Sequence, residues 1–143
     1  MALISSDGFA HVRITVTDIQ RSKAFYDQVF GWPIAVDASQ SAGEPGVTES
    51  REQFFGGTVY QTPQGTLFGL RPAGHTGFDP AHIGLDHVSF AVSSRADLDR
   101  AATALTESGI EHGDVTDLPG AGIAILSFQD PDDINVELTA PLG

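Results

Sequence analysis

The chain of 143 residues has no cysteine, only seven lysines and arginines, and no long hydrophobic run. Without cysteine there are no disulfides, thiolate zinc sites, iron–sulfur clusters or cysteine nucleophiles. Any bound metal must therefore be held by histidine and carboxylate side chains. Because no apolar run approaches the ~20 residues of a bilayer-spanning helix, we expect no membrane insertion.

The scarcity of basic residues gives a formal net charge of -12, since nineteen aspartates and glutamates outnumber them. Such a surface repels phosphate, so we expect no nucleic-acid partner and no binding to anionic membranes. The first residues lack the basic segment and long apolar stretch of a secretion signal, which favours a cytoplasmic location. The acidic surface suits cationic ligands, although solubility alone also accounts for it.

Two segments of the chain resemble each other. Residues 9–16 (FAHVRITV) and 85–92 (LDHVSFAV) both place a histidine third, with valines one and five positions later. The two histidines are His11 and His87. Both segments have the composition of strands, so the chain is expected to contain two copies of one structural unit.

A helix is predicted after each of these strands. In the first half, Asp18 is the expected N-cap and Gly31 the stop. In the second half, Ser94 is the N-cap of a variant capping box and Gly109 ends the helix. The large apolar residues of both segments recur on one helical face, as expected of helices that pack on a sheet.

Three short β segments follow each predicted helix. They are expected at residues 34–36, 57–61 and 66–71, and again at 112–116, 123–129 and 134–139. The pattern predicts an α+β fold of two βαβββ modules, residues 9–71 and 85–140, within a single domain of residues 1–143. A linker rich in glycine and proline, residues 72–84, joins them. Residues 38–52 are predicted to form a long loop, either mobile or acting as a lid.

Alternation along the strands predicts which side chains share a surface. Val12, Ile14 and Val16 are expected to pack on the helix, as are Val88, Phe90, Val92, Val136 and Leu138. The opposite faces then carry His11, His87 and Glu137. Two imidazoles and one carboxylate suit Fe, Mn, Zn, Ni or Co as a divalent ion, and three protein ligands leave positions for substrate.

Several segments together resemble the glyoxalase/bleomycin resistance protein/extradiol dioxygenase superfamily, also called the vicinal oxygen chelate superfamily. They are residues 11–18 (HVRITVTD), 24–26 (AFY), 30–32 (FGW), 86–92 (DHVSFAV) and 130–138 (DPDDINVEL). The resemblance implies paired βαβββ modules whose curved mixed sheets form a cleft, with helices on the outer faces, commonly in a homodimer. It also implies a divalent metal bound by His11, His87 and Glu137.

One ligand position departs from that of glyoxalase I, in which the last strand of each half supplies a glutamate. The first-half equivalent in residues 67–70 (LFGL) is Gly69, which has no side chain to bind a metal. The remaining set of two histidines and one glutamate resembles that of extradiol dioxygenases and fosfomycin-resistance transferases. A strict glyoxalase I assignment is therefore weakened.

The expected function is that of a metal-dependent lyase, isomerase or dioxygenase acting on a small oxygen-chelating metabolite. Glu137 is the candidate to take a proton. Arg13 and Arg71 are candidates to bind a substrate carboxylate, with a surface salt bridge as the alternative role of Arg13. Tyr60, with Phe54 and Phe55, is a candidate to line the cleft, with packing in the core as the alternative role of these aromatic residues. The alternative function is sequestration of a toxic natural product without catalysis.

Overall fold

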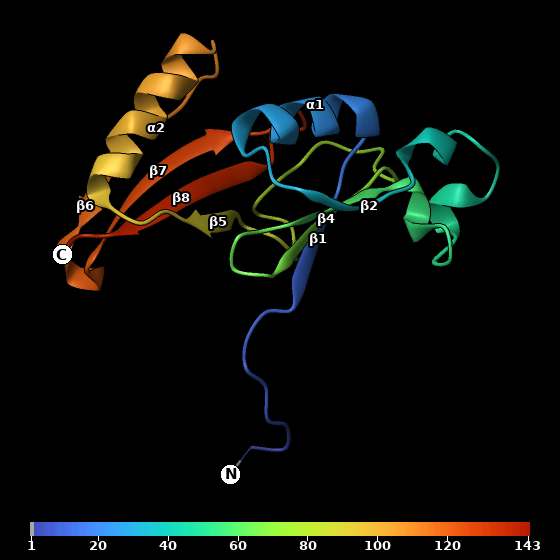
Figure 1. Ribbon diagram of the computed structural model, residues 1–143, viewed down its shortest axis with the longest axis horizontal. Coiled ribbons are helices and arrows are strands. Elements are labelled where there is room, and N and C mark those ends of the chain that lie inside the picture. The colour runs from blue at the N-terminus through green and yellow to red at the C-terminus, as the bar shows by residue number, and fades with distance from the viewer. Residues whose placement is uncertain (1) are drawn as a thin grey trace. The chain divides into compact units, whose positions relative to one another are not determined.

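The computed structural model describes residues 2–143 and divides into two compact units between Thr76 and Gly77. That boundary falls inside the predicted linker. Each unit contains one α-helix and a four-stranded mixed sheet, so the predicted α+β class with two βαβββ modules is confirmed (Figure 1). The two units are described separately below.

The first unit consists of one helix, four strands and three short 3₁₀ helices. Its elements are β1 (His11–Thr15), α1 (Ile19–Val29), β2 (Ile34–Asp37), β3 (Thr58–Gln61) and β4 (Leu67–Arg71). The strand order is β1-β4-β3-β2, with β1 parallel to β4 and the other pairs antiparallel. The 3₁₀ helices are Ser39–Ser41, Val47–Glu49 and Phe54–Gly56, all between β2 and β3.

The second unit repeats the same order of elements. They are β5 (Val88–Ala91), α2 (Arg95–Glu107), β6 (Thr116–Leu118), β7 (Ile123–Gln129) and β8 (Asn135–Pro141). A short 3₁₀ helix, Pro119–Ala121, links β6 to β7. The strand order is β5-β8-β7-β6, and β5 is parallel to β8.

The prediction of a strand over residues 112–116 is wrong for residues 112–115. His112 makes only an isolated bridge to Phe128, and the regular strand begins at Thr116. The imidazole of His112 is bonded to the Thr106 hydroxyl through Nε2, at 2.6 Å, and to the Gly113 carbonyl through Nδ1. These local bonds hold the chain near the end of α2, which delays its entry into the sheet.

Both predicted helix caps are confirmed. The Asp18 carboxylate accepts hydrogen bonds from the backbone N–H groups of Gln20 and Arg21, and the Ser94 hydroxyl accepts one from Asp97. These bonds satisfy amides that have no partner within the helix. Among the helices of residues 2–143, none combines the length and apolar character that a membrane crossing requires.

The alternation of strand faces follows the prediction, although Val12, Val88, Phe90 and Val92 are only half-buried. On the helix side of the first sheet, Ile14, Val16 and Phe68 are buried, whereas His11 and Arg13 lie on the exposed side. In the second unit, Leu98 and Leu105 of α2 are buried, as are Val136 and Leu138 of β8. Burial of apolar side chains on one face of each sheet thus determines which opposite face can carry binding or catalytic residues.

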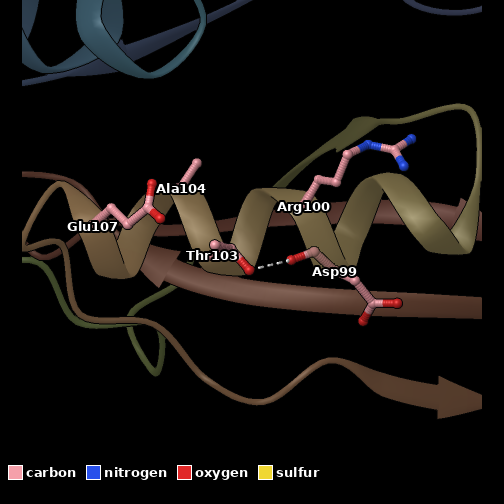
Figure 2. Close-up of a pocket in the computed structure, with 5 residues that line it drawn as sticks. All are labelled: Asp99, Arg100, Thr103, Ala104 and Glu107. Atoms are coloured by element: carbon pink, nitrogen blue, oxygen red, sulfur yellow. Dashed lines mark hydrogen bonds between the residues drawn. The ribbon is translucent and has the colours of Figure 1, made fainter.

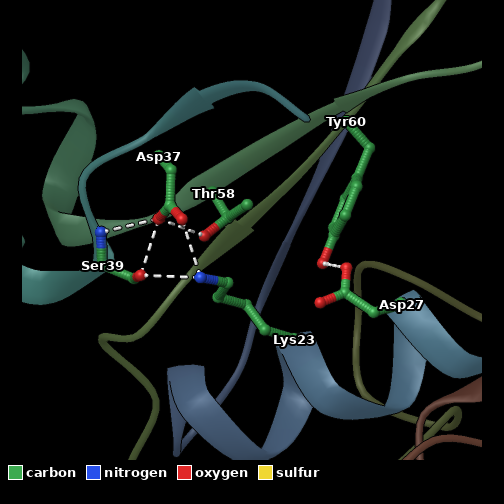
Figure 3. Close-up of polar contacts among 6 residues, drawn as sticks. All are labelled: Lys23, Asp27, Asp37, Ser39, Thr58 and Tyr60. Atoms are coloured by element: carbon green, nitrogen blue, oxygen red, sulfur yellow. Dashed lines mark hydrogen bonds and ion pairs between the residues drawn. The ribbon is translucent and has the colours of Figure 1, made fainter. Parts of the chain in front are cut away.

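A polar cluster ties α1 to the far edge of the first sheet (Figure 3). The Asp37 carboxylate binds Lys23 Nζ at 2.7 Å and accepts hydrogen bonds from the hydroxyls of Ser39 and Thr58. Desolvation acts to raise the pKa of Asp37, but hydrogen bonds from Lys23, Ser39 and Thr58 outweigh it and hold that pKa well below 3.8. The cluster fixes the start of the segment that connects β2 to β3.

Asp37→Asn is expected to lower the free energy of unfolding at pH 7 by about 2 kcal/mol, because a charge-assisted network loses its anion. The depressed pKa in the folded state means that this stabilisation is present above 3.8 and is lost as pH falls below it. The difference in melting temperature between the native chain and the variant should therefore shrink from pH 7 to pH 3. A difference that stays constant over this range, measured by calorimetry, would contradict the assignment.

Candidate functional site

In the second unit, His87 lies immediately before β5 and is held from one side by its neighbour. Its Nδ1 is 2.6 Å from Asp86 Oδ1, and its Nε2 is 3.7 Å from Glu137 Oε1. Because the carboxylate of Asp86 binds Nδ1, a neutral His87 carries its proton there and presents the lone pair of Nε2 toward Glu137. The ring is therefore oriented as a ligand or base.

Glu137 occupies the middle of β8, where strand register places it beside Ser89 of β5. Its side chain is 17% exposed, whereas that of His87 is 43% exposed. Glu137 Oε1 accepts a hydrogen bond from the Thr139 hydroxyl at 3.1 Å, and that hydroxyl is 2.5 Å from Ser89 Oγ. Within residues 2–143, no hydrogen bond is formed by Glu137 Oε2, which leaves that oxygen available for another ligand.

The electrostatic setting of His87 favours a positive charge. The hydrogen bond to Asp86 is the largest contribution to a raised pKa of His87; desolvation opposes it, and the charges of Glu137 and Asp86 add to it. The two carboxylates that stabilise a proton here also stabilise a metal cation in its place. The arrangement suits either a shared proton or a divalent ion.

The structure brings together two of the three predicted ligands. His87 and Glu137 are neighbours in the second unit, whereas His11 stands exposed at the start of β1 in the first. Within either unit, the described part of the chain contains no cluster of three or more histidine, aspartate and glutamate side chains suited to a metal ion. The shared three-ligand site thus remains a prediction.

The exposed face of the first sheet carries an aromatic ring between two arginines. The Phe55 ring centroid is 5.2 Å from the Cζ of Arg13 and 4.1 Å from the Cζ of Arg71. Arg71 is also bonded to the carbonyl of Thr48 through Nε and Nη2, at 3.1 and 2.9 Å, and to Glu49 at 3.0 Å. The ring is positioned by cation–π contacts and by the chain that carries it.

That chain has an unusual backbone at the ring. Phe54 and Phe55 have φ values of 49° and 57°, in the left-handed region that non-glycine residues rarely occupy. Such conformations cost about 1–3 kcal/mol each and persist where surrounding contacts impose them. The predicted loop of residues 38–52 is therefore a folded segment that contains the 3₁₀ helices Ser39–Ser41 and Val47–Glu49. It is anchored by Asp37 at its start and by Arg71 at Thr48.

Tyr60 lies on the opposite side of the same sheet. It is fully buried, and its hydroxyl donates a hydrogen bond to Asp27 of α1 at 2.9 Å (Figure 3). Burial, followed by the bond to Asp27, raises the pKa of the hydroxyl, so it remains a protonated donor. Since Tyr60 packs in the core under α1, it is not carried into the proposed binding site.

The register of the first sheet places Gly69 at the position that corresponds to Glu137 in the second. Gly69 pairs with Arg13 of β1 just as Glu137 pairs with Ser89 of β5. A Cβ atom built on Gly69 would lie 3.1 Å from Nε and 3.3 Å from Cγ of Arg13. The arginine side chain therefore occupies the space that a ligand at position 69 would need.

A separate surface hollow lies along α2 (Figure 2). It is lined by Asp99, Arg100, Thr103, Ala104 and Glu107. All five belong to the helix face turned away from the buried Leu98 and Leu105. None of them is among the predicted site residues, and the hollow is shaped by a single helix, so it is not the candidate site.

A family model and a curated relative both match most of the chain. The family model described as "Glyoxalase/Bleomycin resistance protein/Dioxygenase superfamily" matches residues 8–138. The Bacillus subtilis (strain 168) protein YwkD is 30% identical over 128 residues, which are 90% of this chain and 92% of that protein.

Solved structures give the same result. A glyoxylase/bleomycin resistance protein/dioxygenase domain from Frankia sp. EAN1pec is 31% identical, with a TM-score of 0.76 over 96% of this chain and 93% of that one. A mutant of the fosfomycin resistance protein FosX from Listeria monocytogenes, complexed with Mn(II) and 1S,2S-dihydroxypropylphosphonic acid, is 15% identical. Its TM-score is 0.71 over 96% of this chain and 94% of that one, which shows a shared fold.

Proposed function

The chain belongs to the glyoxalase/bleomycin resistance protein/dioxygenase superfamily, and we propose that it is a divalent-metal-dependent enzyme. Its substrate would be a small metabolite that chelates the metal through two neighbouring oxygens, with His11, His87 and Glu137 as the metal ligands. The observation that carries the proposal is the pair of His87 Nε2 and Glu137 Oε1, 3.7 Å apart.

The donor set fits such an ion. Imidazole nitrogen and carboxylate oxygen suit Fe, Mn, Zn, Ni or Co, and FosX, which shares the fold, holds Mn(II). Asp86 supports His87 as a metal-binding histidine is usually supported, by a carboxylate on its other ring nitrogen. When bound, the metal would act as a Lewis acid toward the chelated oxygens or, as Fe(II), support dioxygen chemistry.

The proposed proton acceptor is Glu137. Its Oε1 is held by the Thr139 hydroxyl, whereas Oε2 receives no hydrogen bond from residues 2–143. A carboxylate fixed through one oxygen keeps the other oriented for proton transfer over a short distance. Ser89 and Thr139, 2.5 Å apart, complete a polar surface beside it that can hydrogen-bond a substrate oxygen.

The rival proposal is a protein that sequesters a cationic natural product, which the net charge of -12 favours. Two observations disfavour it. The exposed face of the first sheet presents Arg13, whose uncompensated positive charge repels a cation. Sequestration alone also gives no role to the pair of His87 and Glu137 or to Asp86, which orients His87. The enzyme proposal gives a role to all three residues.

Titration of the native chain with Mn²⁺ or Zn²⁺, followed by calorimetry, tests this proposal. We expect one ion to bind per chain, and Asp86→Asn to weaken binding by about tenfold because His87 loses its orienting carboxylate. Asp79→Asn is the matched control, since Asp79 pairs with the surface histidine His82 at 3.5 Å. The proposal is wrong if no divalent ion binds, or if both variants change the affinity equally.

A further inference from the structure

Arg13 is an unpaired cation in a strongly acidic protein. Among residues 2–143 its guanidinium makes no hydrogen bond or ion pair, and its polar neighbours on β1 are His11 and Thr15. The chain has only seven basic side chains against nineteen acidic ones. A guanidinium left without a carboxylate in such a protein is available to an anion from outside the chain.

Two contacts nevertheless restrain the side chain of Arg13. Its stem crosses the backbone at Gly69, where the absence of a side chain leaves room for it, and its guanidinium lies over Phe55. The cation–π contact with the Phe55 ring restrains the guanidinium, and its N–H groups stay open to hydrogen bonding. Arg13 therefore resembles a preorganised receptor more than a mobile surface residue.

The second arginine on this face has a different role. Arg71 donates two hydrogen bonds to the Thr48 carbonyl and one to Glu49, so its charge is largely compensated and its donors are engaged. It anchors the segment that carries Phe55. The two arginines, both of which are candidates from sequence to bind a substrate carboxylate, divide into a free receptor and a positioning residue.

We propose that Arg13 binds the carboxylate of the substrate, which assigns the substrate to the class of small oxygenated carboxylic acids. This inference rests on the proposed function, in which His11 binds the metal and two oxygens of the substrate chelate it. His11 and Arg13 lie two residues apart on the same face of β1, a separation of roughly 7 Å along a strand. The carboxylate would thus lie a few bonds from the chelating oxygens.

A carboxylate fits this receptor better than a phosphonate or phosphate does. One guanidinium offers a planar two-donor edge that matches the two oxygens of a carboxylate. A dianion would leave one charge uncompensated, because the neighbouring Arg71 already pairs with Glu49. The two units also differ in charge at matched positions. The second unit has the carboxylate of Glu137 where the first has Gly69, beside the guanidinium of Arg13.

The test compares 3,4-dihydroxybenzoate with its uncharged amide, both of which carry vicinal oxygens. Calorimetry on the metal-loaded native chain should show that the acid binds about tenfold to a hundredfold more tightly than the amide. In Arg13→Gln the ratio of the two dissociation constants should fall close to one. Arg21→Gln, an exposed arginine on α1, should keep the native ratio.

Each contrary result has a distinct meaning. An unchanged ratio in Arg13→Gln, with a native melting temperature, would overturn the inference. So would an Arg13-dependent preference of tenfold or more for 3,4-dihydroxyphenylphosphonate over the benzoate. If instead the chain binds no metal but still prefers the acid in an Arg13-dependent manner, the proposed function fails and the carboxylate receptor stands.

Discussion

Gly57→Ala is expected to lower the free energy of unfolding by about 3 kcal/mol, at the upper end of the cost of overpacking. An added Cβ would lie 1.9 Å from the carbonyl oxygen of Leu70 and 3.2 Å from that of Phe54. Both neighbours are backbone atoms, so no rotamer change relieves the clash. Because φ at Gly57 is -101°, the expected effect comes from crowding and not from backbone conformation.

The matched control is Gly43→Ala, in the same connecting segment. A Cβ at Gly43 has no neighbour within 4 Å, so the expected change is within about 0.5 kcal/mol. Urea denaturation of both variants gives the comparison. Equal stability of the two would show that the close approach of Gly57 to β4, which places Phe55 over the sheet, is not a constraint in solution.

The fold was largely predictable because the sequence contains two similar copies of one structural unit. The matching segments around His11 and His87 indicated two units, and capping residues such as Asp18 and Ser94 indicated the helix starts. Burial requires period-two alternation, so the faces of the first and last strands also followed from sequence.

From the sequence, site residues were predictable only where the alternation of side chains along a strand determines which face of the sheet they occupy. Tyr60 shows the limit: its face depends on its pairing with Phe68, and this register is set by tertiary packing that local pattern does not encode. For the same reason the sequence does not show that Arg13 and Arg71 have different partners. Their different partners arise from the non-periodic segment between β2 and β3, whose conformation depends on contacts with distant residues.

The role of Asp86 was also missed. An aspartate before a strand has no period or spacing that marks it, yet the structure places its carboxylate 2.6 Å from His87 Nδ1. A signal was present in the difference between the repeats, because the position before His11 is Ala10. The two histidines therefore differ in support, and His11 lacks an adjacent carboxylate.

His11→Ala and His87→Ala, one from each unit, are each expected to weaken divalent-metal binding by at least about 100-fold. Losing a direct ligand should cost no less than the tenfold to 100-fold typical of losing a supporting group. His75→Ala is the control, because His75 is an exposed histidine of the first unit outside the strands. Circular dichroism on all three variants checks that the fold is retained.

Calorimetric titration of these variants and the native chain with a single divalent metal tests most directly whether both units ligate one ion. We expect one ion per native chain and the loss of that same binding event in both His11→Ala and His87→Ala. Native affinity and stoichiometry in His11→Ala would contradict it, because the ion would then be bound without the first unit.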